Sequence, residues 1–112
     1  MESKKQGFER AKVYNLNKTI DYAEGAVISK QITKEDNGNI TLFSFDKGQG
    51  LSEHTAAFDA IINVIDGTAE ITINKQKHIL NEGDLIIMPA NIPHAVFAPE
   101  KFKMLLTMIK YK

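Results

Sequence analysis

The chain has 112 residues, of which 43% are hydrophobic and 25% charged, as in a soluble globular domain that buries its own core. Basic and acidic residues both number 14, so the charge balance does not favour nucleic acid or an anionic membrane as a partner. The absence of cysteine excludes disulfides and thiolate metal sites, and leaves His, Asp, Glu or backbone oxygen to hold a metal. No apolar stretch has the length of a membrane span, and the N-terminal MESKKQGFER lacks an apolar signal core, so we expect a cytoplasmic protein.

The order of elements along the chain is typical of an all-β protein. Residues 1–11 are polar, and we expect them to be loosely held; residues 17–24 can form one helical turn. Beyond them, short apolar runs are separated by turn residues at intervals of about 8–12 positions, the spacing found in sandwiches and barrels. With no repeat and no linker, residues 1–112 are predicted to form a single domain. The expected strands cover residues 26–34, 39–46, 51–56, 59–65, 68–74, 77–80, 84–88, 94–98 and 102–110.

Short polar segments predict the turns between these strands. The sequence EDNG at 35–38 separates the first two strands. Asp66 and Gly67 lie between two β-rich runs, and an Asp-Gly pair in that position is a strong hairpin signal. The segments NKQK at 74–77 and NEGD at 81–84 predict two further turns.

Residues 102–110, FKMLLTMIK, differ from the other predicted strands because both of their faces are apolar. Between Met104 and Ile109, Thr107 alone interrupts the apolar run. A strand with one solvent-exposed face alternates between apolar and polar residues, whereas a strand with both faces buried does not. Either a second subunit covers this strand, or it lies centrally within the protein's own layers. We favour the first explanation, which predicts a homodimer.

The first stretch with a residue suited to ligand binding or catalysis is GQGLSEHTAAFDAIINVIDG at residues 48–67. Five residues separate Gly48 from His54, and Gly67 ends the stretch. Histidine is a common metal ligand and a general acid or base near neutral pH. His54 is therefore a candidate site residue.

The second stretch is GDLIIMPANIPHAVFA at residues 83–98. Five residues separate Gly83 from Pro89, and His94 follows two residues after Asn91. Proline fixes the backbone, so a proline-rich turn delivers His94 to the start of the next strand in a defined direction. His94 is the second candidate site residue.

These two stretches resemble the two motifs of the cupin superfamily, and the resemblance covers approximately residues 38–110. The first motif of that family reads glycine, five residues, H-x-H, a glutamate and a hairpin glycine; the second reads glycine, five residues, proline, a small turn residue and a histidine. The resemblance, closest to small single-domain cupins of unassigned function, implies an all-β, double-stranded β-helix or jelly-roll cupin barrel. It also implies that His54 and His94 point into one barrel mouth from different strands.

The chain departs from the metal-binding cupin pattern at two of the four ligand positions. Ala56 stands at the second histidine of H-x-H and Ala60 at the glutamate, so the resemblance implies a degenerate metal site. A protein-held transition metal usually has at least three protein ligands. Asp59 is one residue from the glutamate position and needs a bulge to face the site, because a one-residue shift reverses the face of a strand. A weakly held divalent Zn, Fe, Ni or Mn ion on His54 and His94 stays one hypothesis.

Other residues near the motifs are expected to play supporting roles. Glu53 adjoins His54 and faces away from it if the strand is regular, and His78 matches no cupin ligand position. The cavity is expected to be mostly apolar. Its candidate wall residues are Phe43, Phe45, Phe58, Ile62, Val64, Met88, Val96 and Met104.

Three kinds of function follow from these residues. We favour a binding module that holds a small, largely apolar molecule with His54 and His94 as polar anchors. The second is an enzyme, either a metal-dependent dioxygenase, isomerase or decarboxylase with a reduced ligand set or a metal-free catalyst that uses the imidazoles as acid and base. The third is a structural or regulatory protein whose cavity is residual.

Overall fold

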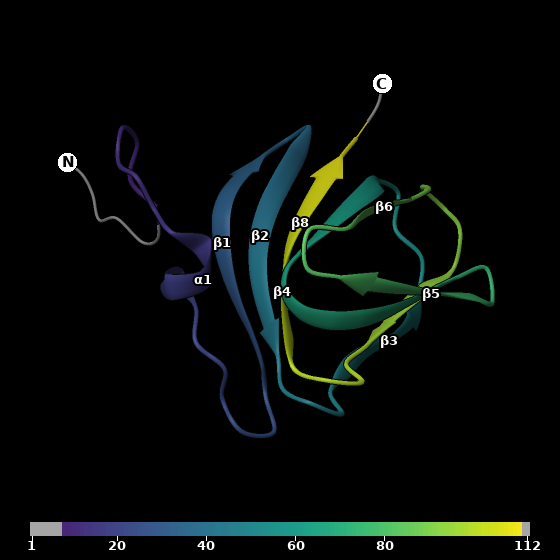
Figure 1. The fold of residues 1–112 in the computed structure, drawn as a ribbon. Coiled ribbons are helices and arrows are strands. Elements are labelled where there is room, and N and C mark those ends of the chain that lie inside the picture. The colour runs from purple at the N-terminus through teal and green to yellow at the C-terminus, as the bar shows by residue number, and fades with distance from the viewer. Residues whose placement is uncertain (1–7, 111–112) are drawn as a thin grey trace.

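A computed structural model describes residues 8–110 and shows a curled, antiparallel, mostly β fold (Figure 1), which confirms the predicted fold class. Of the N-terminal segment predicted to be loose, residues 1–7 lie outside the described residues. Within the described part, no helix is long and apolar enough to cross a membrane. The elements are α1 (Leu16–Thr19), β1 (Val27–Glu35), β2 (Gly38–Phe45), β3 (Gly50–His54), β4 (Asp59–Ile73), β5 (Gln76–Asn81), β6 (Leu85–Met88), β7 (His94–Phe97) and β8 (Phe102–Ile109).

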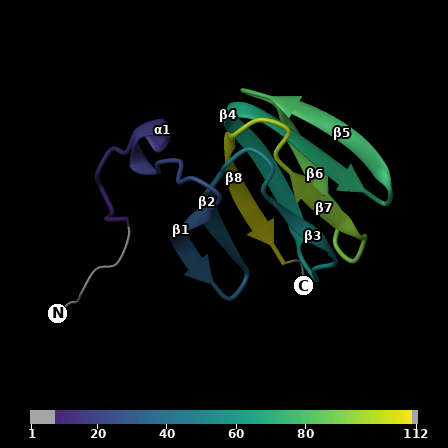
Figure 2. The same cartoon turned by 90° about the horizontal axis from the view of Figure 1, so that it is seen from below.

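The long strand β4 belongs to two sheets. Its first half pairs with β8 and β6, and its second half pairs with β5 and β7, all antiparallel. The first sheet therefore has the order β1-β2-β8-β4-β6, and the second has the order β5-β4-β7-β3. Figures 1 and 2 show the two sheets curling around a shared interior. Side chains from both sheets can thus meet in one cavity.

The bend that carries β4 from one sheet to the other lies at Asp66 and Gly67, where the sequence predicted a hairpin. That prediction is wrong, because the two strands predicted on either side are one continuous strand. The register against β8 slips between Val64 and Asp66, and Gly67 has φ of 78°. A Cβ atom at Gly67 would lie 2.1 Å from the carbonyl oxygen of Lys101, so only glycine fits. Bulges and tight hairpins both favour glycine at positive φ, so the local signal is the same for both.

The other predicted turns are confirmed. Asp36 and Asn37 connect β1 to β2. Asn74 and Lys75 connect β4 to β5, and both have left-handed φ values, 48° and 70°, as a two-residue type I′ hairpin turn requires. Gly83, with φ of 92°, shapes the turn before β6.

The segment around α1 covers part of the outer face of the first sheet. The Ser44 hydroxyl donates to the carbonyl of Asp21 at 2.8 Å, and the Lys103 ammonium donates to the carbonyl of Asn17 at 2.6 Å. The Tyr22 hydroxyl donates to Asp66 at 2.5 Å. Tyr22 has its pKa raised by burial and by the hydrogen bond and negative charge of this carboxylate. These contacts explain why a lysine is buried on a central strand.

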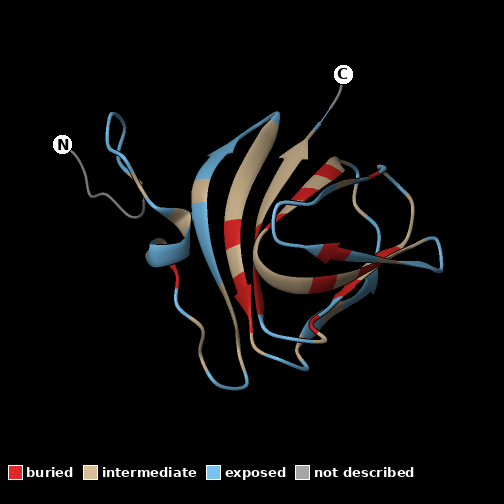
Figure 3. Ribbon diagram, in the orientation of Figure 1, coloured by how far each residue is buried: buried red, intermediate tan, exposed pale blue. Residues whose placement is uncertain are grey.

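The core lies between the sheets, where β2, β4 and β8 carry most of the buried residues (Figure 3). Phe45 and Phe102 are cross-strand partners with fully buried rings that stack at 4.6 Å. β8 lies between β2 and β4, so its position within the protein's own sheet accounts for part of its apolar character. The buried apolar cluster consists of Phe45, Ala60, Ile62, Val64, Ala69, Ile71, Leu80, Met88, Val96, Ala98, Phe102 and Met104.

Candidate functional site

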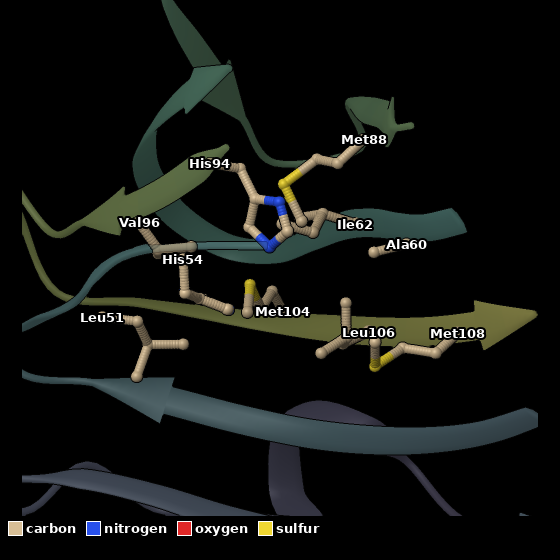
Figure 4. A pocket seen from close by; sticks show the side chains of 10 residues that line it. All are labelled: Leu51, His54, Ala60, Ile62, Met88, His94, Val96, Met104, Leu106 and Met108. Atoms are coloured by element: carbon tan, nitrogen blue, oxygen red, sulfur yellow. The ribbon is translucent and has the colours of Figure 1, made fainter. Parts of the chain in front are cut away.

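A pocket lies between the two sheets, with β3 and β7 on one wall and β4, β6 and β8 on the other (Figure 4). Its volume is about 50 Å³, well below the roughly 300–1,000 Å³ of a pocket that encloses a drug-sized molecule. The two histidines are the polar side chains among the residues that line it. These residues are Leu51, His54, Ala60, Ile62, Met88, His94, Val96, Met104, Leu106 and Met108.

His94 opens β7, the strand that lies between β3 and β4 in the second sheet. The loop before it is held by the backbone N–H of Asn91, which donates to the carbonyl of Ala56 at 2.7 Å, and by the carbonyl of Pro93, which accepts from Asn74 at 2.8 Å. The side chain of His94 is 4% exposed. The proline-shaped turn predicted from the sequence therefore places a buried imidazole at the pocket.

His54 reaches the pocket because β3 contains a bulge. Leu51 pairs with Val96 and His54 pairs with His94, so three steps along β3 match two steps along β7. One extra residue restores the inward orientation, and as a result Leu51 and His54 both line the pocket although they are three residues apart. In a regular strand these two side chains would point to opposite faces. The sequence carried no signal for this bulge.

The two imidazoles form a cross-strand pair. Their ring centroids are 4.5 Å apart, and the ring planes are inclined at 68° in an edge-to-face arrangement. The Nδ1 of His54 lies 2.7 Å from the carbonyl oxygen of Ser52, and the Nδ1 of His94 lies 3.2 Å from that of Ile92. A carbonyl only accepts, so each Nδ1 carries the hydrogen and donates it. In the neutral rings, each Nε2 keeps a lone pair for a hydrogen-bond donor or a metal.

Burial lowers the pKa of His94 below its ordinary value, because desolvation disfavours the charged ring. The positive charge of a protonated His54 lowers this pKa further, and the hydrogen bond to the carbonyl of Ile92 acts in the opposite direction. His94 is consequently neutral at pH 7. A neutral imidazole accepts hydrogen bonds and binds metals through Nε2.

The two lost ligand positions of the cupin pattern can be located. Ala60 lines the pocket from β4, so the position of the family glutamate faces the cavity with a methyl group in place of a carboxylate. Ala56 lies after the end of β3, and its backbone carbonyl accepts the N–H of Asn91. Among residues 8–110, no three His, Cys, Asp or Glu side chains are placed to hold a metal ion together. The residues present do not fit the divalent metal site of the family.

The structure does not bring the other polar candidates to the histidines. Asp59 is not among the pocket residues, and its Oδ1 accepts the backbone N–H of Ala90 at 2.8 Å. This carboxylate fastens the loop before His94 to the start of β4. Glu53 is exposed on β3, and His78 lies half-buried on β5 away from the pocket.

The predicted walls of the cavity are correct in part. Ile62, Met88, Val96 and Met104 line the pocket as expected. Phe45 and Val64 belong to the buried cluster, Phe43 packs against it, and Phe58 lies in the loop between β3 and β4. The sequence did not predict three further wall residues, Leu51, Leu106 and Met108. Alternation along a strand indicates which face a residue lies on, but not at which end of the barrel it lies.

The comparisons with known proteins agree with the fold. The model of the Cupin domain family matches residues 41–110, and the chain belongs to the cupin family. A conserved protein of unknown function from Streptococcus pyogenes is 37% identical over 99% of this chain and 97% of that chain, with a TM-score of 0.91. Among the curated proteins, none matches the chain significantly.

Two further solved structures are similar. A cupin superfamily protein from Desulfitobacterium hafniense is 28% identical over 97% of this chain and 100% of that chain, with a TM-score of 0.87. A Cupin 2 conserved barrel domain protein from Leptotrichia buccalis is 39% identical, with a TM-score of 0.85. That match covers 87% of this chain and 47% of the longer one.

Proposed function

We propose that this cupin binds a small ligand between its two sheets, with the Nε2 atoms of His54 and His94 as polar anchors. The supporting observation is the state of His94. Its ring is buried, its Nδ1 is engaged by Ile92, and its Nε2 has no hydrogen-bond partner among the described residues. A buried polar atom without a partner costs about 1–3 kcal/mol, and a ligand that supplies the partner recovers this cost.

The dimensions and chemistry of the pocket restrict the ligand. The Nε2 lone pairs of the two histidines can bind a hydrogen-bond donor or a cation, and the other residues that line the pocket are apolar. A volume of about 50 Å³ admits only a small group. The ligand is therefore a species of few atoms or the end of a longer molecule that enters through the mouth of the pocket.

The contact between the rings favours binding over acid–base catalysis by the pair. At a centroid separation of 4.5 Å the two imidazoles touch, which leaves no space for a substrate between them. Two unprotonated Nε2 atoms in one pocket are instead suited to holding a ligand.

A screen of small metabolites by thermal shift and native mass spectrometry tests this function. We expect at least one compound to stabilise the wild-type protein and to bind with one molecule per chain. His94→Ala removes that stabilisation, whereas His78→Ala, a histidine change away from the pocket, retains it. Equal binding by wild type and His94→Ala would contradict the proposal, as would the absence of any pocket ligand.

We also propose that a second copy of the chain covers the outer face of the first sheet. Leu85 and Ile87 are 58% and 53% exposed there. Ile87 pairs with Ile61 on β4, and Leu85 pairs with Asn63, whose partner on the other side is Leu105 of β8. The segments outside the described residues, MESKKQG and YK, have too little apolar surface to cover this face. Light scattering is expected to give a dimer for the wild type and a monomer for the folded Leu85→Lys, Ile87→Lys double variant; a monomeric wild type contradicts this.

A further inference from the structure

The methionines of this chain are concentrated in the pocket. Apart from Met1, the sequence contains three methionines, Met88, Met104 and Met108, and all three line the cavity together with two of the three histidines. Because thioether sulfur is a soft, neutral ligand, this clustering changes which metals suit the site.

Strand pairing places Met88 and Met108 beside Ala60, and Met104 lies earlier on β8, opposite Val64. Ala60 has Met88 as its cross-strand partner on β6 and Met108 as its partner on β8. The family glutamate position is thus flanked by methionine on both sides. Figure 4 shows the sulfur atoms of Met88 and Met104 on either side of the His94 ring, and that of Met108 farther along β8.

The absence of negative charge in the pocket favours a monovalent metal ion over a divalent one. No carboxylate lines the pocket, so a divalent ion would lack an anionic ligand in largely apolar surroundings. A monovalent ion carries a smaller desolvation cost. Imidazole nitrogen and thioether sulfur are both neutral, and soft sulfur ligands select Cu(I) over the harder divalent ions.

We propose that the pocket binds Cu(I) through the Nε2 atoms of His54 and His94 and the thioether sulfurs of Met88 and Met104. This inference rests on the proposed function, because it assigns the ligand of the same two histidines. The unpartnered, buried Nε2 of His94 supplies an independent indication of a ligand at this position. A volume of about 50 Å³ holds an ion with one or two waters.

The alternative role for the methionines is the filling of irregular core space, since Met88 and Met104 are 3% and 1% exposed. Replacement by leucine separates the two roles. Leucine keeps the volume and the apolar character but removes the sulfur, and cores tolerate this exchange well. A role in packing alone leaves copper binding unchanged in the leucine variants.

The test is an anaerobic titration of the full chain with Cu(I), held reduced by ascorbate and competed by the chromophoric chelator bicinchoninate. We expect one Cu(I) per wild-type chain, no stoichiometric binding by His94→Ala, and affinity reduced at least a hundredfold in Met88→Leu, Met104→Leu. Met108→Leu, at the third methionine of the pocket, is expected to weaken binding much less than the double variant does. His78→Ala, outside the pocket, is the control and is expected to bind as the wild type does. Circular dichroism and thermal melting confirm that each variant is folded.

The outcomes distinguish this inference from the proposed function. Wild-type affinity in the folded double leucine variant overturns the methionine ligands, and equal weakening by Met108→Leu overturns the assigned ligand set. Failure of the wild type to bind Cu(I), combined with His94-dependent binding of an organic metabolite, overturns the copper inference and leaves the proposed function standing. Failure of both kinds of ligand overturns both.

Discussion

The two walls of the pocket differ in chemistry although one strand, β4, runs through both sheets. The wall from the second sheet carries the two imidazoles, and the wall from the first sheet carries Ala60 and three methionines. Two of the family's three histidine positions are retained as His54 and His94, whereas Ala56 stands at the third and Ala60 at the glutamate position. The two walls therefore offer different ligand chemistry, imidazole nitrogen on one side and thioether sulfur on the other, although β4 joins them.

The largest effect is expected where β4 joins the walls. Gly67→Ala introduces a Cβ against the carbonyl of Lys101 and the backbone of Phe102, in a conformation that L residues rarely adopt. We expect a loss of about 3–5 kcal/mol in the free energy of unfolding, measured in urea. Gly25→Ala is the control, because Gly25 also has positive φ but has no atom within 4 Å of its Cβ position. Gly25→Ala should lose only about 1 kcal/mol of unfolding free energy. Equal losses in the two variants would show that close packing around Gly67 does not cause the loss in Gly67→Ala.

Restoring the carboxylate tests the difference between the walls directly. Ala60→Glu buries an acid in an apolar wall, so the metal-free protein is expected to lose about 2–4 kcal/mol of stability. The same change should tighten Zn(II) or Mn(II) binding at least tenfold, because it supplies a third protein ligand. Ala60→Gln has the same shape without the charge, and should lose stability without gaining affinity. Equal divalent binding by the two variants contradicts the account of the wall.

Much of this site could be predicted from the sequence, and Ala60 shows why. The resemblance to the cupin motifs implied that Ala60 stands at the glutamate position and that His54 and His94 point into one barrel mouth, and all three residues line the pocket. Asp59, which the motif spacing places on the opposite face, indeed fastens a loop.

The remaining features depend on interactions that local pattern does not encode. A hairpin and a bulge both use glycine at positive φ, so Gly67 could not distinguish them. The bulge that turns His54 inward is set by pairing with β7, far along the chain. Met108 and Leu106 share the inward parity of Met104, and only the curvature of the sheets brings all three to the pocket.

A smaller difference is expected between the two histidines themselves. His94→Ala removes a buried ring and leaves the carbonyl of Ile92 without its donor, which should cost about 1–2 kcal/mol. His54 lies on the exposed edge strand β3, and His54→Ala should cost about 0.5 kcal/mol or less. Chemical unfolding of the chelator-treated variants measures both. A larger loss at His54 contradicts the assignment of His94 as the buried partner.

The smallest effect is the pH dependence that His94 contributes to the metal-free protein. Its folded pKa is lowered by burial, so below about pH 6.5 the unfolded chain binds the proton first. Its stabilising contribution is complete above that pH and declines as the pH falls toward the folded pKa. Asp46, whose pKa is lowered by hydrogen bonds from Gly25 and Lys47, acts only at more acidic pH. Unfolding between pH 5 and 7 should show a shallower slope for His94→Gln than for wild type; identical slopes refute the effect.

The central claim is that the pocket presents two imidazole Nε2 lone pairs. Long-range ¹H–¹⁵N correlation spectra of the histidine rings in metal-free protein at pH 8 test it most directly. Because Nδ1 donates to a carbonyl in both His54 and His94, both rings should give the pattern of the Nδ1–H tautomer, with Nε2 unprotonated. An Nε2–H tautomer at either ring would contradict the account, because that ring would then have no lone pair to offer a ligand.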